Sequence, residues 1–364
     1  MEVPSGNDLL KLINEKTLEN MVPRWVRNIV ANEAMIRKGE GIIKFFNKDE
    51  KYDEKGNLIH DGTGRLKDIP AIIVSGGPSL NKNIKYLKEA KDKACIIAID
   101  STVGIVMKQG IKPDFVVMTD PEWGEWAQPF KDLPMSTKGI PLLIDVYVNQ
   151  KALEFWEGEI YWYCVFPIES CALTKYVEPE FTGKPIGKLG CGGCVSSVAF
   201  AFAQGTLQCD PIIMIGEDHG YYDREYHHAE GIEVPQPVVG EEVVEDIYGR
   251  PMLTTPVYKA YNFWFERIVC GSYTAGFPQV NGIFINATEG GWMTKGWLTM
   301  PFKIVIDKYL KKKYDIKELI KKRPKQVVKG TEKRKIIQKP TIINGKAVIQ
   351  EVAQKKGKQT DKNA

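Results

Sequence analysis

The sequence has no run of about 18 or more apolar residues, so it predicts no helix that could cross a membrane. Its first residues, MEVPSGNDLL, also lack the basic and then apolar pattern of a secretory signal. The seven cysteines are odd in number and irregularly spaced, which argues against a disulfide framework and favours reduced thiols. These absences together lead us to expect a cytoplasmic protein.

The composition is that of an ordinary globular chain, with 43% hydrophobic and 26% charged residues. The net charge of +4 hides an asymmetry, because residues 303–364 contain 20 Lys and Arg against 6 Asp and Glu. The preceding residues are therefore acidic overall. We expect 303–364 to be a basic tail, helical at first and then disordered, that contacts an anionic partner such as nucleic acid or a membrane surface. A merely solubilising tail is an equal alternative.

The most informative stretch is AIIVSGGPSL, at residues 71–80. Residues 71–74 form an apolar run typical of a buried strand, a glycine turn follows, and residues 83–90 have helical spacing. This order is the entry unit of a doubly wound α/β sheet. Glycines let a backbone approach a ligand, and a helix start favours phosphate, although a turn that binds nothing has the same pattern. The candidate nucleotide-binding residues here are Gly76, Gly77, Pro78 and Ser79.

Further apolar strands are predicted at 94–100, 113–120, 141–150, 159–167, 211–215 and 283–286, with helices at 101–109 and 149–157. Two of these strands end in an aspartate, at Asp100 and Asp120. In an open parallel sheet the ligand lies beyond the carboxyl ends of the strands. We therefore place Asp100, Thr102 and Asp120 beside the ribose or base of a nucleotide, with helix capping as the alternative for Asp100.

The flanking regions suggest the domain boundaries. Residues 7–38 have helical periodicity, and Pro23 is expected to separate two helices there. Residues 45–65 are polar and rich in turn residues, as in a linker. We predict an N-terminal helical segment and linker at 1–65, a Rossmann-like nucleotide-binding domain at 66–302 with a mostly parallel sheet, and the basic tail at 303–364.

A second glycine-rich helix start lies within KLGCGGCVSSVAFAFAQG, at residues 188–205. Its backbone donors and hydroxyls are suited to a phosphate or a carboxylate. The candidate residues are Gly192, Gly193, Ser196 and Ser197. Cys191 and Cys194 have no second pair at ligand spacing, so we interpret them as small residues of a tight turn and predict no metal site.

Three of the four histidines lie between residues 219 and 228, beside acids and tyrosines that follow a predicted strand. A histidine is suited to act as a general base, because its unperturbed pKa lies near working pH. We favour His228, on a loop, as the base, and expect Asp218 to hold the ring of His219 and raise its pKa. The candidate catalytic residues are therefore His228, His219 and Asp218. Candidate contacts to the substrate or its phosphate are Tyr221, Tyr222, Asn286, Thr288 and Glu289.

Four blocks in order carry a resemblance: SGGPSL with AID and KPDFVVMTD, then GCGGCVSSVAFAFAQG, IGEDHGYYD with HHAEG, and NATEGG. Over about residues 70–300 they resemble the 6-hydroxymethylpterin pyrophosphokinase family, called MptE-like, which includes the motility accessory factors, glycosyltransferase-like proteins of flagellar nonulosonate transfer. They are also similar to bacterial sialyltransferases that use a CMP-activated sugar. The resemblance implies a Rossmann-like sheet with a nucleotide at the first glycine loop.

The two branches of the family differ after the third strand. The pterin branch has a metal-binding Asp-x-Asp-Gly motif there, whereas this sequence has Asp120, Pro121 and Glu122. The resemblance therefore implies a transferase that moves a CMP-nonulosonate-type sugar to an acceptor, which is a protein, a glycan or a pterin, without a tightly bound cofactor. One alternative is a Mg²⁺-dependent pyrophosphokinase that uses ATP, with Asp120 and Glu122 as metal ligands. The other is a non-catalytic nucleotide-binding protein.

Overall fold

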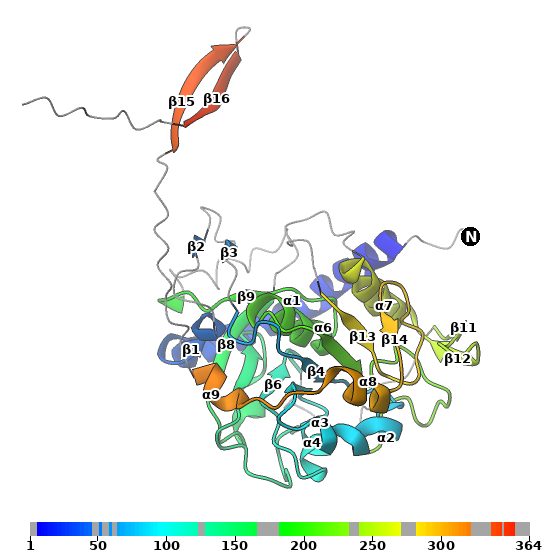
Figure 1. The fold of residues 1–364 in the computed structure, drawn as a ribbon. Coiled ribbons are helices and arrows are strands. Elements are labelled where there is room, and N and C mark those ends of the chain that lie inside the picture. Colours follow the sequence, from blue (N-terminus) through cyan, green and yellow to red (C-terminus); the bar gives the residue numbers. More distant parts are fainter. Residues whose placement is uncertain are drawn as a thin grey trace, which may run out of the picture. The chain divides into compact units, whose positions relative to one another are not determined.

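The computed structural model describes residues 6–45, 51–52, 58–59, 64–122, 128–165, 182–232, 240–270, 282–321, 336–343 and 346–353. The chain divides into two compact units, Met1–Arg323 and Pro324–Ala364. The first unit contains one large sheet with helices on both faces (Figure 1). The second contains β15 (Ile336–Ile343) and β16 (Lys346–Ala353), an antiparallel pair. This hairpin lies where we expected a helix or disorder.

The large sheet has ten strands, in the order β1-β8-β7-β6-β5-β4-β10-β13-β14, with β9 beside β8. All of its strand pairs are parallel. Its strands are β1 (Glu40–Gly41), β4 (Ala71–Val74), β5 (Cys95–Ile99), β6 (Phe115–Met118), β7 (Leu142–Asp145), β8 (Ile160–Val165), β9 (Lys188–Leu189), β10 (Ile212–Ile215), β13 (Phe284–Asn286) and β14 (Leu298–Thr299). The predicted Rossmann-like parallel sheet is confirmed.

The strand order reverses between β4 and β10. From β4 the chain runs outward through β5, β6 and β7 to β8, and then crosses back so that β10 pairs with the other side of β4. Such a reversal separates the loops that leave the two central strands, and open α/β sheets bind ligands at this point. A ligand site is therefore expected at the loops after β4 and β10.

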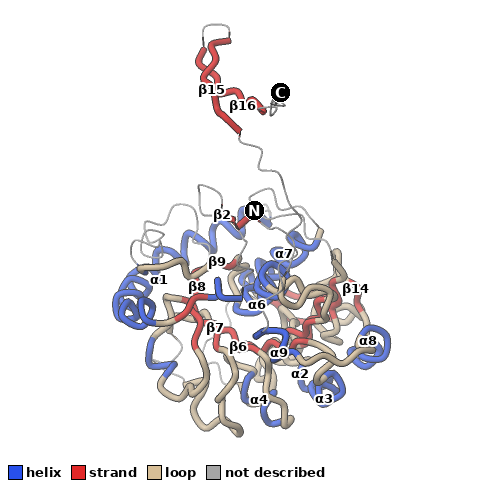
Figure 2. Tube along the Cα trace, turned by 60° about the vertical axis from the view of Figure 1, so that its left-hand side comes forward, coloured by secondary structure: helices blue, strands red, loops and turns tan. Residues whose placement is uncertain are grey.

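Alternating side chains of the strands build a separate core on each face of the sheet. Ile72 and Val74 face one core, whereas Ala71 and Ile73 face the other. The first core is covered by α1 (Gly6–Lys38), α2 (Leu80–Asn83), η2 (Ile84–Tyr86), α3 (Leu87–Ala90), α4 (Val103–Lys108), η3 (Gln150–Leu153) and α8 (Phe302–Tyr309). The second is covered by η1 (Ile42–Phe45), α6 (Val195–Ala201), η5 (Phe202–Thr206), α7 (Pro256–Val269) and α9 (Ile316–Lys321). Figure 2 shows α6 and α7 on the opposite side of the red strands from α3 and α4.

The N-terminal segment is one helix, so our expectation that Pro23 separates two helices is wrong. Helix α1 runs through Pro23 without a break. Tertiary contacts stabilise it beyond the proline: Asn28 donates to the carbonyl of Tyr147 at 2.8 Å, and Asn32 to that of Val148 at 2.8 Å. After the helix, β1 joins the edge of the sheet beside β8. The segment is therefore packed on the sheet.

Other boundaries differ from the sequence prediction in detail. The helix expected at 149–157 is the single 3-10 turn η3. Of the expected linker at 45–65, the short pair β2 (Lys51–Tyr52) and β3 (Leu58–Ile59) is described, and residues 46–50, 53–57 and 60–63 lie outside the described residues. Helices α8 and α9, which belong to the expected basic tail, bury Val305, Ile306, Ile316 and Ile320 against the cores. The C-terminal residues 354–364 lie outside the described residues.

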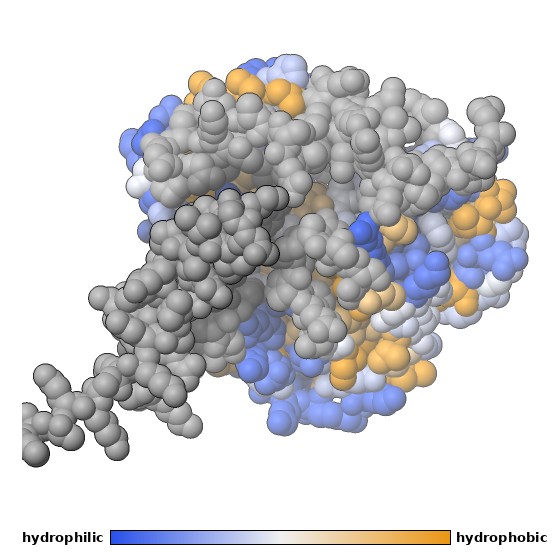
Figure 3. Space-filling model, turned by 90° about the horizontal axis from the view of Figure 1, so that it is seen from above, coloured by the Kyte–Doolittle hydropathy of each residue, from blue (hydrophilic) through white to orange (hydrophobic). Residues whose placement is uncertain are grey.

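A two-stranded antiparallel hairpin, β11 (Glu242–Glu245) and β12 (Pro251–Thr254), separates β10 from α7 along the chain. On the face seen in Figure 3, hydrophobic and hydrophilic residues are interspersed. A helix long and apolar enough to span a bilayer does not occur among the described residues.

Candidate functional site

The loops after β4 and β10 are joined by a buried carboxylate. Asp218 Oδ2 accepts hydrogen bonds from the hydroxyl of Ser79 at 2.7 Å and from its backbone N–H at 3.2 Å. Burial raises the pKa of Asp218 to about 7, against the lowering effect of these two bonds. The donors of Ser79, which we assigned to a nucleotide, are therefore used by the protein's own carboxylate.

The contact between Asp218 and Ser79 leaves no space for a side chain at Gly77. A Cβ atom at Gly77 would lie 2.1 Å from Asp218 Oδ2 and 2.7 Å from the carbonyl oxygen of Gly216. The Gly77 N–H itself donates to that carbonyl at 2.7 Å. A missing side chain at Gly77 thus lets the two loops pack together. Its contact with a nucleotide stays a prediction, as do those of Gly76 and Pro78.

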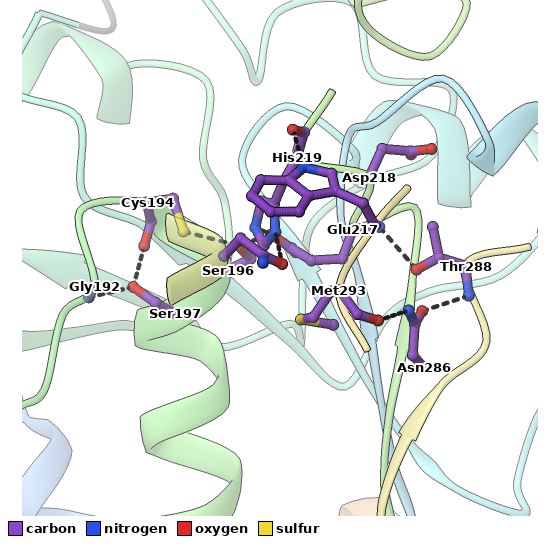
Figure 4. A network of polar contacts seen from close by, with 12 residues as sticks. Gly192, Cys194, Ser196, Ser197, Glu217, Asp218, His219, Asn286, Thr288 and Met293 are labelled. Carbon is purple, nitrogen blue, oxygen red and sulfur yellow. Dashed lines mark hydrogen bonds and ion pairs between the residues drawn. The ribbon is translucent and has the colours of Figure 1, made fainter. Parts of the chain in front are cut away.

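Next to Asp218, Glu217 and His219 form a buried ion pair on the other side of the β10 loop (Figure 4). Glu217 Oε1 lies 2.7 Å from His219 Nε2 and accepts a bond from the Ser196 hydroxyl at 3.0 Å. His219 Nδ1 lies 3.3 Å from Asn262 Oδ1 on α7. Although burial alone would lower it, the Glu217 carboxylate raises the pKa of His219 to about 10.

The structure corrects the role that we gave Asp218 toward His219. Glu217, and not Asp218, holds the imidazole, because Asp218 is turned toward Ser79. The carbonyl of His219 is also fixed, by the Thr254 hydroxyl at 2.8 Å and the Trp292 indole at 2.8 Å. An imidazole that keeps its proton at neutral pH cannot accept another, so His219 does not fit the role of general base.

His228 differs from His219 in protonation. Burial, and then the neighbouring His227, lower the pKa of His228 to about 4, so its ring is neutral at pH 7. The backbone beyond it is held on the first glycine loop, because the Ala229 N–H donates to the Gly76 carbonyl at 2.9 Å. Glu230 N–H donates to Asn81 Oδ1 at 3.0 Å. The backbone that follows this neutral imidazole is thus fixed to the loop after β4.

Asp100 and Asp120 lie at the ends of neighbouring strands, as predicted. Asp100 Oδ1 accepts the Ser101 N–H at 2.7 Å. Burial, and then the charge of Asp120, raise the pKa of Asp100 to about 8, so its carboxyl is largely neutral at pH 7. The hydroxyl of Thr102 donates to the Val74 carbonyl at 2.8 Å and ties this loop to β4. Thr102 therefore has a structural role in addition to the predicted one.

In the kinase alternative, the carboxylates of Asp120 and Glu122 would hold a metal, and both already have partners in the protein. Asp120 Oδ1 accepts the backbone N–H of Glu122 at 2.8 Å, while the Glu122 side chain pairs with Arg24 of α1. Across the described ranges, no group of three or more His, Cys, Asp or Glu side chains could hold a metal ion. Glu122 is thus engaged by Arg24, and the role of Asp120 and Glu122 as Mg²⁺ ligands stays a prediction.

Hydrogen bonds within the second glycine-rich helix start also hold this turn together. The Ser197 hydroxyl accepts the Gly192 N–H at 2.7 Å and donates to the Cys194 carbonyl at 2.6 Å. Gly193 has φ +98°, and a Cβ there would lie 2.6 Å from the ring of Tyr261. This turn brings Ser196 to Glu217 (Figure 4). Cys191 and Cys194 are free thiols.

The remaining candidates hold the neighbouring loops in place. Asn286 donates to the Met293 carbonyl at 2.8 Å, and the Thr288 hydroxyl accepts the Glu217 N–H at 3.2 Å (Figure 4). Glu289 Oε1 accepts the Phe302 N–H at 3.0 Å. Tyr221 donates to Glu241 at 2.6 Å, and Tyr222 donates to Asp246. These side chains surround the Glu217–Asp218 loop, and contact with a substrate stays a prediction for each.

Buried polar atoms without a hydrogen-bond partner gather at the carboxyl edge of the sheet. Within the described part of the chain, five of them are oxygen atoms of residues at or just after the ends of β4, β5, β7 and β10, with β6 lying between β5 and β7. They are Ser75 Oγ after β4, Asp100 Oδ2 after β5, Asp145 Oδ2 in β7, and Glu217 Oε2 and Asp218 Oδ1 after β10. Native proteins pair nearly all such atoms, so unpaired ones at one edge indicate a ligand site.

Sequence reasoning missed three residues of this region: Asp145, Glu217 and Asn262. Burial raises the pKa of Asp145 well above its usual range. The sequence did contain a signal for Asp145, because the apolar run LLID ends in an aspartate just as CIIAID does. Nothing in the local sequence indicated that Glu217 would pair with His219, or that Asn262 of α7 would reach that ring.

The family model described as "6-hydroxymethylpterin diphosphokinase MptE-like" matches residues 27–224. An uncharacterized protein of Treponema pallidum (strain Nichols) is 32% identical over 66 residues, which are 18% of this chain and 31% of that protein. The solved structure of MAf glycosyltransferase from Magnetospirillum magneticum AMB-1 matches with a TM-score of 0.54 and 17% identity, over 79% of this chain and 41% of that chain. That likeness shows the fold, and this chain spans less than half the length of either relative.

The first prediction concerns Gly77. Gly77→Ala should lower the free energy of unfolding by about 1–3 kcal/mol, because the added methyl overlaps Asp218 and a backbone carbonyl. Gly205→Ala is the matched control, since a Cβ at Gly205 meets nothing within 4 Å. Urea unfolding would measure both. Equal stability of the two variants would mean that the Gly77 loop can accommodate a methyl group.

The second prediction concerns the pH dependence that His219 contributes. Its pKa is raised above the unfolded value of 6.5 to about 10, so its stabilisation is complete below about pH 6.5 and is lost as pH rises toward 10. The stability difference between wild type and His219→Gln should therefore shrink by more than about 1 kcal/mol between pH 6 and 10. His228→Gln is the control. Because the pKa of His228 is lowered to about 4, the pH dependence of stability that this residue contributes lies below pH 6.5. Parallel stability curves for wild type and His219→Gln from pH 6 to 10 would exclude the ion pair.

Proposed function

Because the chain belongs to the 6-hydroxymethylpterin diphosphokinase MptE-like family, we propose that it is a nucleotide-dependent transferase that moves a glycosyl group from a nucleotide-activated sugar to an acceptor hydroxyl. The match over residues 27–224 includes the loops after β4, β5, β6 and β10. The fold likeness to a MAf glycosyltransferase supports the glycosyl-transfer branch, without bearing on the substrate.

The observation that carries the proposal is the set of unpaired buried polar atoms at the carboxyl edge. Leaving such atoms without partners costs about 1–3 kcal/mol each, and a polar ligand removes this cost. At neutral pH a proton remains on the Asp100 carboxyl, and Asp100 Oδ1 already accepts the Ser101 N–H, so Oδ2 offers a donor. A ribose or base, which has acceptor atoms, is a suitable partner.

In this proposal His228 is the general base. Its neutral imidazole takes the proton of the acceptor hydroxyl as that oxygen forms a bond to the anomeric carbon. The bond between the anomeric carbon and the phosphate oxygen breaks, and the leaving nucleotide keeps the electron pair. The contact of Ala229 with Gly76 holds this histidine on the loop that borders the site.

The alternative with ATP and Mg²⁺ has the family description in its favour and the geometry against it. Glu122 is committed to Arg24, so a metal would have to be held by other groups. Binding assays with and without Mg²⁺ separate the two reactions, because a diphosphokinase needs the metal on the phosphates of ATP.

The third prediction tests the nucleotide. CMP should raise the unfolding midpoint of the wild type without Mg²⁺, and UDP-sugars and ATP should raise it less. Asp100→Ala should weaken CMP binding by about tenfold or more through loss of a buried donor. Asp114→Ala is the matched control, because Asp114 is a half-buried aspartate whose pKa is also raised, but it precedes β6, at the opposite ends of the strands. Binding of ATP that requires Mg²⁺, with no response to CMP, would support the diphosphokinase instead.

The fourth prediction tests the base. With CMP-sugar as donor, His228→Ala should lower turnover by about two to four powers of ten while CMP affinity stays unchanged. His227→Ala, at the adjacent ring, should have a much smaller effect. Single-turnover kinetics measure this step, and full activity of His228→Ala would remove that residue from the chemistry.

A further inference from the structure

Helix α1 contacts the carboxyl edge of the sheet, although it precedes the Rossmann-like domain that we predicted from the sequence. Four of its residues make the contact, and we call them the α1 clamp: Arg24, Trp25, Asn28 and Asn32. Their spacing of three, four and seven residues brings them to one side of the helix. Asn28 is 4% exposed and Asn32 is fully buried, so both amides need partners inside the protein.

The Asn28 amide joins two loops that leave neighbouring strands. Its Nδ2 donates to the Pro121 carbonyl at 3.0 Å, in the loop after β6, and to the Tyr147 carbonyl at 2.8 Å, in the loop after β7. The pairing of β6 with β7 ends at Met118 and Ile144, and each of the two carbonyls lies three residues beyond that pair. An amide NH₂ group has two protons and can serve both carbonyls at once. Asn28 thus connects the two loops beyond the point where the hydrogen bonds between the strands end.

The other residues of the α1 clamp each contact one of these loops. Arg24 pairs with the Glu122 carboxylate, in the loop after β6. The Trp25 ring stacks on that of Tyr147, in the loop after β7, with ring centres 5.1 Å apart. Asn32 Nδ2 also donates to two carbonyls, at 3.0 and 2.8 Å, but both belong to the loop after β7. Of these contacts, only those of Asn28 join both loops.

The two loops carry acids of the candidate site. Asp120 directly precedes Pro121, and its Oδ1 accepts the Glu122 N–H at 2.8 Å. Asp145 ends β7, and its Oδ1 accepts the Tyr147 N–H at 3.4 Å, while its Oδ2 is one of the unpaired buried atoms. Each carboxyl is therefore bound to backbone that the α1 clamp holds. The spacing of the two carboxyls depends on how the α1 clamp spaces the loops.

The position of the loop after β6 also acts on the end of β5. Burial, and then the charge of Asp120, raise the pKa of Asp100 to about 8. If the loop moved outward, Asp120 would move away from Asp100 and water would reach that carboxyl, and both changes would lower its pKa. The titration of Asp100 therefore reports the position of this loop without any ligand.

We propose that Asn28 is a positioning residue of the candidate site, because its amide keeps the loops after β6 and β7 at the separation at which Asp120 and Asp145 bind a ligand. Asn28 touches no reacting atom and acts through the backbone of the two loops. Displacing a group of a site by about 1 Å can cost about 100-fold in rate, so such spacing is worth holding. In so far as the ligand is a nucleotide, this inference rests on the proposed function.

The experiment compares Asn28→Ala with the matched control Asn32→Ala. Both variants remove an amide from the same helix and leave two carbonyls without that donor, but only Asn28→Ala releases the loop after β6. One measurement is the titration of Asp100, followed by NMR of the aspartate carboxyl carbons and assigned with Asp100→Asn. The other is the affinity for CMP, measured by titration calorimetry. Urea unfolding gives the stability of each variant.

We expect both variants to lower the urea midpoint to a similar extent, because each loses two hydrogen bonds to carbonyls. In Asn28→Ala the pKa of Asp100 should fall by about one unit or more, and the affinity for CMP should fall about tenfold or more. In Asn32→Ala both quantities should stay close to those of the wild type.

A milder pair of variants serves if the alanine variants do not fold. The hydroxyl of Asn28→Ser can donate to only one of the two carbonyls, so this variant should shift the pKa of Asp100 in the same direction but by less. Asn32→Ser is its control and should leave that pKa unchanged.

An Asp100 titration that is unchanged in the Asn28 variants, or that shifts equally in the Asn32 variants, overturns the inference, because the amide then contributes to stability alone. An unchanged affinity for CMP in Asn28→Ala also overturns it, provided that the wild type binds CMP. In both cases CMP binding by the wild type leaves the proposed transferase intact. If the wild type does not bind CMP while the pKa of Asp100 falls in the Asn28 variants alone, Asn28 keeps its role and the nucleotide assignment fails.

Discussion

The buried contact between Asp218 and Ser79 is the constraint on which the rest of the site depends. It places a carboxylate from the β10 loop at the start of α2, where the backbone N–H and hydroxyl of Ser79 bind it. Such a helix start would suit a phosphate, and the protein supplies its own anion there. The loops after β4 and β10 are therefore held together at the reversal of strand order. A side chain is excluded at Gly77, where they meet, and at Gly290 of the loop after β13, which packs against both Asp218 and Ser79.

This packing determines protonation at the carboxyl edge. Burial raises the pKa of Asp218 to about 7 and that of Asp100 to about 8, so neither is firmly ionised at neutral pH. Glu217 keeps the proton on His219, while partial burial and the neighbouring His227 keep His228 neutral. Two histidines nine residues apart thus have opposite protonation because of their different neighbours. In the proposed reaction, the edge would offer proton donors and one neutral imidazole to the nucleotide-sugar.

The strands of the sheet could be predicted from the sequence, but the contacts between polar side chains in the candidate site could not. Apolar β-branched runs located β4, β5, β6 and β10, and the aspartates that end the strands located the edge, because both signals are local. The partner of each polar side chain is decided by tertiary contacts: Arg24 of α1 reaches Glu122, and Asn262 of α7 reaches His219. The continuity of α1 through Pro23 likewise depends on its packing against residues 146–148.

Unpaired acid oxygens lie on both sides of the reversal of strand order. Those of Asp100 and Asp145 are on the β5 side, and those of Glu217 and Asp218 follow β10. Between them, the segment with His228 is held on the Gly76 loop. In the proposed reaction, His228 would act as the base at the point where the two substrates meet. The Asp218–Ser79 contact holds the loops after β4 and β10 in position next to that point. It would therefore affect catalysis by positioning residues, and not by transferring a proton.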